Sequence, residues 1–384
     1  MIRLGIIGFG TRMARMLSCF QAAAPDLRVV GIVDPSPQAA LERLPEEQRD
    51  GLQFFDSLEE LLSVARPDAL AIGTRCDLHT PIAIRAAAAG LPIFLEKPVA
   101  ISMEQARALE RAYADAAVEV VVSFPLRVSK LFTMTKTLLA ENAVGRPEHI
   151  LGVNYVPYGD VYFNTWYRDY QITQGLFLQK ATHDFDYLAH LMGSPIVRIA
   201  AMAQQGRVYR DRSLEPIGGD PTRAYHEGIG TPESGMNEDA CNALLEFGNG
   251  AQGLYTQVFY TKHAGAARGA TVSGLRGTLQ FDWYKNTVNL HHHYSNRTTT
   301  QYPPAGLEHF GGDEVLAQNF IAVIRSEARS ASPISVGLQS VYACLAAKES
   351  AVTGRFMDVQ PLTDLVPEGP ERVLGADPRP AFAH

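Results

Sequence analysis

Apolar runs and amphipathic stretches alternate through the first third of the chain. The runs are short and almost continuous, as in strands of a parallel sheet that is covered on both faces. Between them, apolar residues recur every three or four positions, which predicts helices. The expected strands are 4–7, 29–33, 69–72, 93–95 and 118–122, with a weaker one around Phe54, and the expected helices include 11–23, 79–89 and 103–117. This alternation predicts an α/β domain with a doubly wound parallel sheet over residues 1–123.

After residue 123 the pattern changes to a helix at 129–141, a strand at 149–153 and then mostly strands. Segments such as "ACNALLEF", "AQGLYTQVFY" and "GTLQFDWY" predict these strands, and "FGNGAQG" indicates a hairpin turn. Helices at 313–326 and 336–353 follow. We therefore expect one mostly antiparallel sheet with helices on one face, a long polar loop over 207–234 and a surface tail after Pro361.

The segment 175–193, "GLFLQKATHDFDYLAHLMG", predicts a helix with two different stripes. One stripe is apolar at helical spacing and suits the protein core. The other stripe is polar and holds Gln179, His183, Tyr187 and His190. A helix that faces water does not need two histidines and a tyrosine on one line, so we expect this stripe to face a ligand.

Composition and charge narrow the functional classes. The 384 residues carry a formal net charge of −7, which disfavours a nucleic-acid-binding protein. The four cysteines are too widely spaced to predict a zinc site or a disulfide framework, and the histidine run 291–293 alternates faces on a strand, so no metal is expected. No apolar run approaches the ~18 residues of a membrane span, and "MIRLGIIGFG" lacks a signal-peptide pattern. A cytoplasmic protein without membrane contact is therefore expected.

A glycine pair marks the turn between the first strand and the first helix. In "RLGIIGFGTRM", Gly8 permits a tight turn, and Gly10 lets the backbone approach a pyrophosphate at the positive end of the helix. A third glycine is expected where this chain has Met13, which puts the close packing of helix and strand in question. The residues predicted to contact the cofactor in this loop are Gly8, Phe9, Gly10, Thr11 and Arg12.

Asp34 follows the second strand in "VVGIVDPSP". A carboxylate at this position accepts hydrogen bonds from ribose hydroxyls and repels a 2′-phosphate, so the sequence predicts NAD rather than NADP. Arg12 complicates the choice, because an arginine can meet either phosphate group. The alternative is that Gly8 and Gly10 form a plain turn and that Asp34 caps a helix.

The segment "FLEKPVA" follows the fifth predicted strand, at the sheet edge where doubly wound folds bind ligands. Glu96 and Lys97 point to opposite faces if the strand continues, so one of them faces the cleft. A lysine that is partly desolvated beside a nicotinamide loses its proton more easily, which suits acid–base chemistry on an alcohol. The alternative is a surface ion pair between Glu96 and Lys97 or another neighbour.

"GIIGFG", "GTRCDLH", "EKP" and the helix with "THDFD" occur in an order and spacing that resemble the glucose–fructose oxidoreductase/inositol dehydrogenase (Gfo/Idh/MocA) family over nearly the whole chain. The resemblance implies an NAD-binding Rossmann domain at 1–123 and a substrate-binding and oligomerisation α/β domain with a large open sheet at 124–384. It also implies a nicotinamide in the cleft and a sugar, polyol or related substrate. The resemblance places Thr74, Cys76 and His79 beside the cofactor and implies that Lys97 binds the reacting hydroxyl. Glu96 and Lys97 are predicted cofactor contacts as well, from their place after the fifth strand.

Many members of that family carry Asp-x-x-x-His on the substrate helix. Here the histidine position falls on His183 and the aspartate position on Gln179, which cannot take a proton. We therefore hypothesise that His183 is the catalytic acid–base group, that Lys97 holds and polarises the hydroxyl, and that Gln179 hydrogen-bonds a neighbouring one. The alternatives are a satisfied core histidine at position 183 and a surface pair between Lys180 and Asp184.

Further substrate-binding candidates surround the expected cleft. Arg127 follows the last strand of the first domain, and "YFNTWYRDY" supplies Trp166 and Arg168. Aromatic faces with an arginine suit a sugar ring, and a cation suits a carboxylate or sulfonate substituent. Lys180 and Tyr187 on the substrate helix complete the set. The alternatives are a surface loop packed by its own aromatics and a core tyrosine at position 187.

The sequence therefore predicts an NAD-dependent oxidoreductase that moves a hydride between nicotinamide and a hydroxyl carbon of a sugar, sugar derivative or polyol. A redox-neutral, NAD-dependent glycosidase is the second hypothesis; it oxidises a ring hydroxyl, eliminates the aglycone, adds water and returns the hydride. A non-catalytic dinucleotide-sensing protein is the third, and Lys97 and His183 argue against it. A homodimer or homotetramer is expected by analogy, because the second face of the strand-rich half needs covering.

Overall fold

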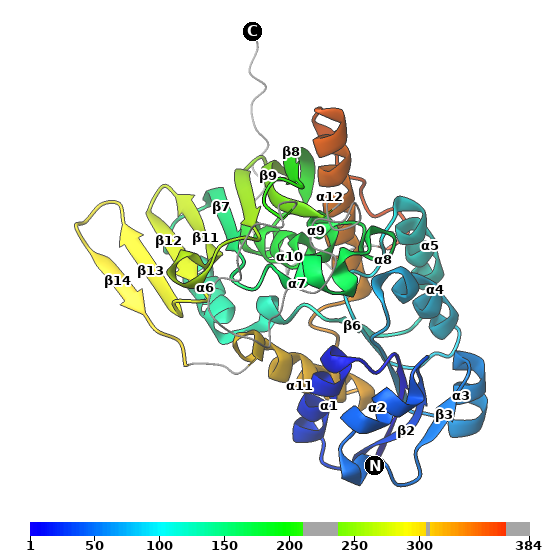
Figure 1. The fold of residues 1–384 in the computed structure, drawn as a ribbon. Helices are drawn as coiled ribbons and strands as arrows, with labels where there is room; N and C mark the ends of the chain where they lie inside the picture. The colour runs from blue at the N-terminus through cyan, green and yellow to red at the C-terminus, as the bar shows by residue number, and fades with distance from the viewer. Residues whose placement is uncertain (210–236, 305–307, 366–384) are drawn as a thin grey trace.

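The computed structural model describes residues 1–209, 237–304 and 308–365. Two β-sheets organise the fold, and each carries its own helices (Figure 1). The N-terminal segment, drawn in blue and cyan, forms the first sheet, and the green and yellow segment forms most of the second. The predicted pairing of a parallel α/β unit with a second, mostly antiparallel sheet is confirmed.

The first sheet is fully parallel, with the strand order β3-β2-β1-β4-β5-β6. The order reverses direction between β1 and β4, which predicts a ligand crevice at the carboxyl ends of these two strands. The strands are β1 (Ile2–Ile7), β2 (Leu27–Val33), β3 (Gln53–Phe55), β4 (Ala69–Ile72), β5 (Ile93–Leu95) and β6 (Val120–Val122). The helices between them are α1 (Thr11–Ala23), α2 (Pro37–Arg43), η1 (Glu46–Gln48), α3 (Leu58–Ala65), α4 (Cys76–Ala87) and α5 (Met103–Ala114).

Met13 occupies the α1 position at which the sequence pattern predicts a third glycine. Its side chain is buried. The space for it comes from Gly73, directly after β4, because a Cβ on Gly73 would lie 2.6 Å from Met13 Cε. The small residue therefore stands at the end of the facing strand instead of in the helix, and the close packing of α1 on the sheet is kept.

The second sheet has the strand order β14-β13-β12-β11-β7-β10-β9-β8-β15. Only the β7–β10 pair is parallel among the described strand pairs of this sheet. The strands are β7 (Pro147–Tyr155), β8 (Ile196–Gln205), β9 (Glu238–Phe247), β10 (Gln252–Val258), β11 (Ala267–Gly274), β12 (Gly277–Asp282), β13 (Thr287–His292), β14 (Thr298–Gln301) and β15 (Met357–Asp358).

The helices of the second half include several short ones around the predicted substrate helix. They are η2 (Pro125–Val128), α6 (Lys130–Ala140), α7 (Val161–Asn164), η3 (Trp166–Arg168), α8 (Tyr170–Thr173), α9 (Leu176–Gln179), α10 (Ala181–Met192), η6 (His263–Gly265), η7 (Glu308–Gly311), α11 (Gly312–Ile324) and α12 (Ile334–Thr353). The single helix expected over 175–193 is divided at Lys180 into α9 and α10.

Helices cover one face of the second sheet. α10 packs on β7 and α12, and α12 packs along β8. On the other face, Leu151, Leu244 and Leu254 are neighbours across β7, β9 and β10 and stay 38%, 49% and 39% exposed. Among the described residues, the second face of the sheet therefore exposes an apolar patch formed by these three leucines.

The chain returns to the first sheet near its C-terminal end. α11 packs against α1, beside the N-terminal lobe (Figure 1). The ring centroid of Phe320 in α11 lies 5.2 Å from that of Phe20 and 5.7 Å from that of Phe94. The core under the first sheet thus includes a helix from the last quarter of the sequence.

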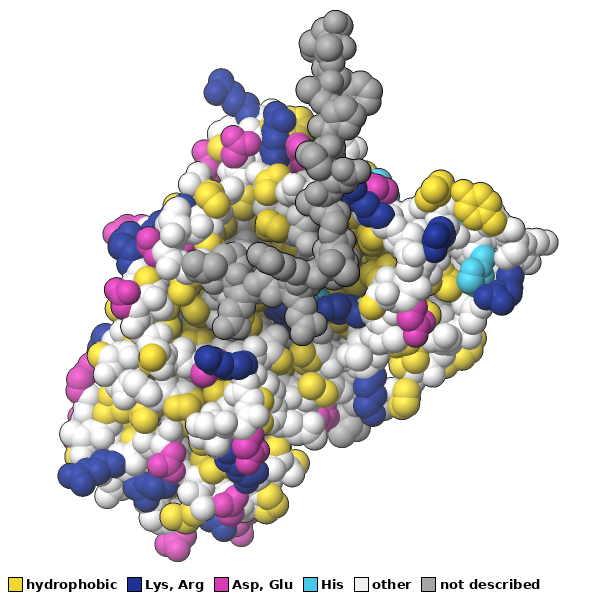
Figure 2. Space-filling view, turned by 180° about the vertical axis from the view of Figure 1, so that it is seen from behind, with side chains coloured by type: hydrophobic (Ala, Val, Ile, Leu, Met, Phe, Trp, Pro, Cys, Tyr) yellow, Lys and Arg dark blue, Asp and Glu magenta, His cyan; other side chains and the backbone are white. Residues whose placement is uncertain are grey.

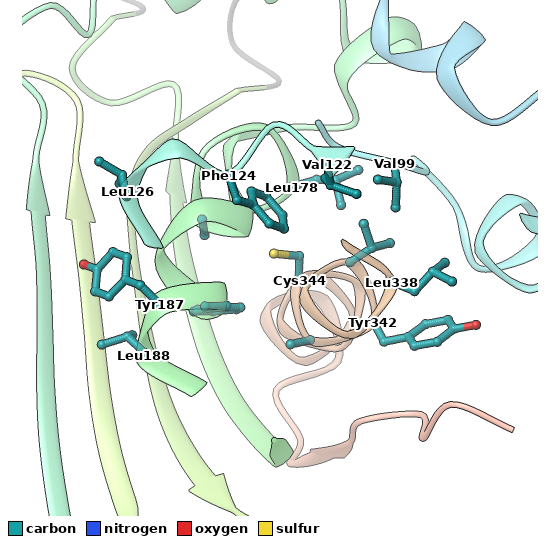
Figure 3. Close-up of a cluster of buried hydrophobic side chains, with 14 of the residues drawn as sticks. Val99, Val122, Phe124, Leu126, Leu178, Tyr187, Leu188, Leu338, Tyr342 and Cys344 are labelled. Atoms are coloured by element: carbon teal, nitrogen blue, oxygen red, sulfur yellow. The ribbon is translucent and has the colours of Figure 1, made fainter. Parts of the chain in front are cut away.

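α12 runs through an apolar cluster shared by the two sheets. Figure 3 shows Leu338 and Cys344 of this helix in one cluster with Val99 and Val122. Val99 follows β5, and Val122 is the last residue of β6. Leu178 of α9 belongs to the same cluster. The packing therefore fixes α9, which carries Gln179, against β6 at the edge of the first sheet.

The predicted loop at 207–234 lies outside the described residues from position 210 onward, and the tail lies outside them after position 365. Within the described part, no helix is long and apolar enough to cross a membrane. On the face shown in Figure 2, basic and acidic side chains are interspersed. That distribution is ordinary for a protein surface.

Replacement of Gly312 by alanine tests the attachment of α11. A Cβ at this position would lie 2.0 Å from the Pro125 carbonyl oxygen, so the helix would have to move. We expect Gly312→Ala to lower the free energy of unfolding by about 1–3 kcal/mol, as overpacked sites do. Gly265→Ala is the matched control, because its Cβ would meet nothing closer than 3.9 Å. Equal losses for the two variants in urea unfolding would contradict this prediction.

Candidate active site

The loop after β1 forms the first wall of the site. Gly8 has a φ of +81°, and its N–H donates a hydrogen bond of 2.8 Å to the Val33 carbonyl. A Cβ on Gly8 would lie 2.7 Å from the Thr74 backbone, so glycine is required there. Gly10 precedes α1, and no described atom lies within 4 Å of the position its Cβ would take. No described side chain caps the first turn of α1, so this open helix terminus fits a diphosphate.

Asp34, directly after β2, shapes the same loop. Its Oδ2 accepts a hydrogen bond of 2.7 Å from the Phe9 N–H, and its Oδ1 accepts one of 2.8 Å from the Ser36 N–H. The residue is only half-buried, and each carboxylate oxygen has a further lone pair for a ribose hydroxyl. The ring of Phe9 is fully buried in the core, whereas Thr11 is exposed at the start of α1. Any cofactor contact of Phe9 is therefore made by its backbone.

Arg12 is engaged by protein groups. Its guanidinium donates to Asp313 at 2.6 and 2.7 Å, to Glu96 at 2.9 Å and to the Ser123 hydroxyl at 3.0 Å. Burial lowers the pKa of Arg12, but the two carboxylates outweigh burial and raise it above its ordinary value. In place of the predicted phosphate, Arg12 holds a buried ion cluster that joins α1, the end of β5 and α11.

Asp313 and His309 are site residues that the sequence reasoning missed. His309 Nδ1 lies 2.9 Å from Asp313 Oδ2, and the ring centroid of His309 lies 6.4 Å from that of His183. Burial lowers the pKa of His309, and the hydrogen bond to Asp313 offsets part of this effect. The two residues lie in a segment without a recognisable motif, so no local signal marks them.

His79 and Cys76, both on α4, support the site. His79 is buried, with Nδ1 2.8 Å from the Pro98 carbonyl oxygen and Nε2 3.2 Å from the Thr74 carbonyl oxygen. Burial raises the pKa of the Cys76 thiol to about 11, and its Sγ accepts a hydrogen bond of 3.4 Å from Gln179 Nε2. The imidazole thus connects the EKP segment to the loop after β4, and the neutral thiol holds an amide of α9.

Lys97 lies at the centre of the site, two residues after β5. Its Nζ donates hydrogen bonds to the backbone oxygen of Gln179 at 2.8 Å and to Oε1 of the same residue at 2.9 Å. Burial lowers the pKa of Lys97 to about 8, and the positive charge of Lys180 contributes to the shift. The neighbouring Glu96 pairs with Arg12, so the partner of this ammonium is an amide and not a carboxylate.

His183, on α10, lies one helical turn beyond Gln179. It is 7% exposed, its ring centroid lies 5.6 Å from that of Phe124, and its Nδ1 has no hydrogen-bond partner among the described residues. Burial lowers the pKa of His183 well below its ordinary value, and the charge of Lys97 is the next largest cause. The imidazole is therefore neutral, and it lies within electrostatic reach of Lys97.

The rest of the predicted polar stripe faces protein. Tyr187 is fully buried, and its hydroxyl donates to the Gly269 carbonyl of β11 at 3.3 Å. In Figure 3 its ring points away from α12 and toward the strands of the second sheet. His190 stacks on an aromatic ring of α6. The alternative of a core tyrosine therefore describes Tyr187, because the sheet lies on that side of the helix.

Arg127, in η2, is also engaged within the protein. One Nη donates to Asp186 Oδ1 at 2.9 Å, and the other lies 3.3 Å from His190 Nδ1. The side chains of Arg127 and Asp186 are 7% and 3% exposed. This placement uses the guanidinium for a buried ion pair and leaves no support for the predicted contact with substrate.

Lys180 and Asp184 are both buried, so they are not the surface pair that their spacing allows. Lys180 Nζ donates a hydrogen bond of 2.7 Å to the Tyr158 hydroxyl. Asp184 Oδ1 accepts from Arg268 at 3.1 and 2.8 Å, and its other oxygen accepts from side chains of β7 and β10. Lys180 therefore lies among the site residues with a phenol as its partner.

The aromatic candidates lie on η3. The Arg75 guanidinium carbon lies 3.9 Å from the centroid of the Trp166 ring, which stacks on Tyr167 at a centroid distance of 3.9 Å. Because Arg75 directly follows Thr74, this stack connects η3 to the loop after β4. Arg168 is half-buried at the end of η3. Trp166 thus lies next to the predicted cofactor crevice.

The structure therefore assembles the central set of predicted residues and leaves two out. Lys97 is hydrogen-bonded to Gln179, and Lys180 and His183 lie within electrostatic reach of Lys97. Arg127 and Tyr187 instead bind protein groups. A neutral imidazole beside a lysine of lowered pKa is suited to exchange a proton with a hydroxyl. Among the described residues, no group of three or more His, Cys, Asp or Glu is placed to hold a metal ion.

Two family models match the chain. Residues 2–124 match the oxidoreductase family with an NAD-binding Rossmann fold, and residues 132–280 match the GFO/IDH/MocA C-terminal domain. Together they cover well over half of the 384 residues.

Curated relatives are more distant. An inositol 2-dehydrogenase of Rhizobium meliloti (strain 1021) is 27% identical over 203 residues, which are 53% of this chain and 58% of that protein. A levoglucosan dehydrogenase of Pseudarthrobacter phenanthrenivorans is 26% identical over 269 residues, 66% of each chain. Matches to the oxidoreductase YteT of Bacillus subtilis span 40% of its length, so the chain aligns with about half the length of such relatives.

Solved structures share the fold over almost the whole chain. Levoglucosan dehydrogenase in complex with NADH and levoglucosan has a TM-score of 0.76 at 19% identity, covering 93% of this chain and 99% of that one. An NAD-binding oxidoreductase from Klebsiella pneumoniae has a TM-score of 0.74 at 22% identity, covering 94% and 99%. At these identities the likeness establishes the architecture.

Replacement of Asp313 by asparagine tests the buried ion cluster. Asp313 is 0% exposed, and loss of one member of a buried ion pair leaves charge uncompensated, so we expect about 3 kcal/mol less unfolding free energy at neutral pH. Although burial raises its pKa, His309 and Arg12 hold the pKa of Asp313 well below the ordinary value. The wild type therefore loses this stability as the pH falls below about 4, where unfolded aspartate protonates, and the two proteins converge in acid.

The control for Asp313→Asn is Glu59→Gln, which removes a carboxylate from the exposed pair with Arg85. We expect no measurable change, because exposed ion pairs contribute little. Equal losses for the two variants, measured by denaturant unfolding across pH, would contradict the assigned role of the cluster.

Proposed function

Because the chain belongs to the GFO/IDH/MocA oxidoreductase family, we propose that it is an NAD-dependent dehydrogenase that moves a hydride between nicotinamide and a hydroxyl carbon of a sugar, sugar derivative or polyol. Relatives named inositol 2-dehydrogenase and levoglucosan dehydrogenase support this substrate class. The observation that carries the proposal is the buried Lys97 at the carboxyl edge of the parallel sheet, which is hydrogen-bonded to Gln179 and lies within electrostatic reach of His183.

The cofactor loop fits the proposal. NAD, when bound, accepts or returns the hydride. The open start of α1 after Gly10 would hold its diphosphate, and Asp34 would accept hydrogen bonds from its ribose, which favours NAD over NADP. Thr74, Cys76 and His79 form the opposite wall of the loop region, and His79 holds the EKP segment in place.

Lys97 is the group that we assign to proton exchange. An uncharged lysine has two N–H bonds, and the two oxygens of Gln179 accept both of them, which leaves the lone pair free for a substrate hydroxyl. During oxidation, the hydroxyl proton moves to this lone pair while the hydrogen on carbon leaves as hydride. A pKa near 8 places the group close to the working pH, where a general base is most effective.

His183 has a positioning part in this scheme. Its imidazole stays neutral, because burial and the charge of Lys97 oppose protonation. A buried Nδ1 without a partner in the described residues is available for a hydrogen bond to a substrate hydroxyl. The pKa directions thus favour Lys97 over His183 for the proton that sequence reasoning alone assigns to His183.

Two further sequence predictions remain proposals here. Residues 1–123 are proposed as the cofactor unit and 124–384 as the unit for substrate binding and oligomerisation. The open face around Leu151, Leu244 and Leu254 supports a homodimer or homotetramer, because a contiguous apolar patch of this kind favours a partner.

The pH dependence of oxidation tests the role of Lys97. The lysine is uncharged above its lowered pKa, so we expect kcat/KM for oxidation to rise with pH through about 8. Gln179→Asp places a carboxylate beside the ammonium and favours the charged form, so the rise should move upward by about one pH unit or more. Gln179→Glu places the same negative charge on a side chain of the original length, so the rise should move in the same direction. A profile that does not move in either variant would exclude Lys97 as the titrating base.

Replacement of His183 tests both the reaction and its second residue. In the wild type, NADH should accumulate in proportion to substrate consumed, whereas a redox-neutral glycosidase releases sugar without net NADH. We expect His183→Ala to lower kcat/KM by about 10- to 100-fold, the effect of a lost buried hydrogen bond, with NAD affinity unchanged. The rise with pH should persist in this variant. Loss of the rise in this variant would identify His183 as the group that takes the proton.

A further inference from the structure

Two buried ammonium groups in the site have no carboxylate partner among the described residues. Lys97 Nζ bonds to the two oxygens of Gln179. Lys180 is 6% exposed, and its Nζ bonds to the Tyr158 hydroxyl and lies 4.8 Å from the centroid of that ring. Taking an ammonium out of water without a counter-ion is costly, so two buried lysines without a carboxylate partner point to a ligand.

The carboxylates near these lysines are already used. Glu96 and Asp313 both bind Arg12, and Asp313 also binds His309. Asp184 binds Arg268 through one oxygen and two neutral side chains through the other. Each of these carboxylates is thus committed to an arginine, and none of those near the lysines in the described part of the site is left for Lys180.

The Lys180–Tyr158 pair is also reachable. Tyr158 stays 38% exposed, although the Lys180 side chain beside it is buried. Burial raises the pKa of Tyr158, but the positive charges of Lys180 and Arg268 outweigh burial and bring it to about 8. The lowered pKa of Tyr158 is consistent with the positive charge that Lys180 and Arg268 place around it.

We infer that the substrate carries a carboxylate, which binds the Lys180 ammonium and the Tyr158 hydroxyl while the reacting hydroxyl binds Lys97. This inference rests on the proposed dehydrogenase function and narrows its substrate class to polyhydroxylated acids, such as uronic or aldonic acids. Lys97 binds both oxygens of Gln179, and Lys180 is the next residue along the chain, so both ammonium groups belong to one site. One ligand that holds both a carboxylate and a hydroxyl is therefore expected to reach both.

A carboxylate fits this donor set better than a phosphate ester does. Lys180 and Tyr158 supply one N–H and one O–H donor for two oxygens, and the Lys180 ammonium carries one positive charge. A phosphate ester carries close to two negative charges and three terminal oxygens, and proteins bind it with several N–H groups or an arginine fork. The guanidinium of Arg268, which acts electrostatically on Lys180, is held by Asp184.

The test is a binding comparison in matched pairs. Calorimetric titration of the full chain with NADH bound measures affinity for gluconate against glucitol, glucuronate against glucose, and galacturonate against galactose. We expect the acid of at least one pair to bind about tenfold or more tightly than its neutral partner, as a charge-assisted contact provides. Glucose 6-phosphate is the phosphate arm. Equal affinities within all three pairs, or tighter binding of the phosphate than of every acid, overturns the inference.

Variants assign the preference to the lysine. Lys180→Met keeps the length of the side chain and removes its charge, and we expect the preference for the acid to fall to within about twofold. Lys285→Met, at a lysine that is 69% exposed, is the control and should keep the full preference. A preference that survives in Lys180→Met overturns the assignment. Where that variant fails to bind NADH, Tyr158→Phe replaces it, with an expected several-fold loss of preference; an unchanged preference there also counts against the inference.

Turnover separates this inference from the function on which it rests. An acid that binds preferentially through Lys180 but yields no NADH with NAD⁺ present refutes the dehydrogenase and leaves the carboxylate site standing. NADH formed from neutral polyols, with no preference for acids, supports the dehydrogenase function and refutes the carboxylate site.

Discussion

The buried guanidinium of Arg12 is the constraint on which the site depends. It needs negative partners because a charge without compensation is too costly to bury, and it takes them from Glu96 and Asp313. These residues belong to α1, the segment after β5 and α11, so three distant parts of the chain must meet at one atom group. Glu96 immediately precedes Lys97. The same ion cluster that closes the fold therefore fixes the backbone of the central lysine.

This arrangement also explains the electrostatics of the reacting groups. Because Arg12 takes Glu96 and Asp313, and Arg268 takes Asp184, none of these three described carboxylates is left for Lys97. Lys97 donates its hydrogen bonds to an amide instead, and burial then lowers the pKa of Lys97 to about 8. The arginines thus bind the carboxylates around Lys97, and the pKa of the lysine stays lowered.

Local patterns in the sequence were sufficient for part of this picture. The apolar runs of the first sheet, the glycine turn and the order of EKP and the substrate helix all depend on residues close in sequence. Asp313, one of the partners of Arg12, lies 301 positions away in a segment with no motif, so no local pattern contains it. The stripe on the substrate helix was ambiguous for the same reason: His183 and Tyr187 share a line, and only the position of the second sheet decides that Tyr187 is core.

The packing of α11 on α1 has a consequence for how the protein can be divided. Phe320 covers Phe20 and Phe94, so a fragment that stops near residue 123 exposes an aromatic surface that the intact chain conceals. The nucleotide half is thus contiguous in sequence but not self-sufficient in three dimensions. Transplanting it into another scaffold, or exchanging modules between homologues at that junction, has to bring the late helix along or redesign the surface beneath it.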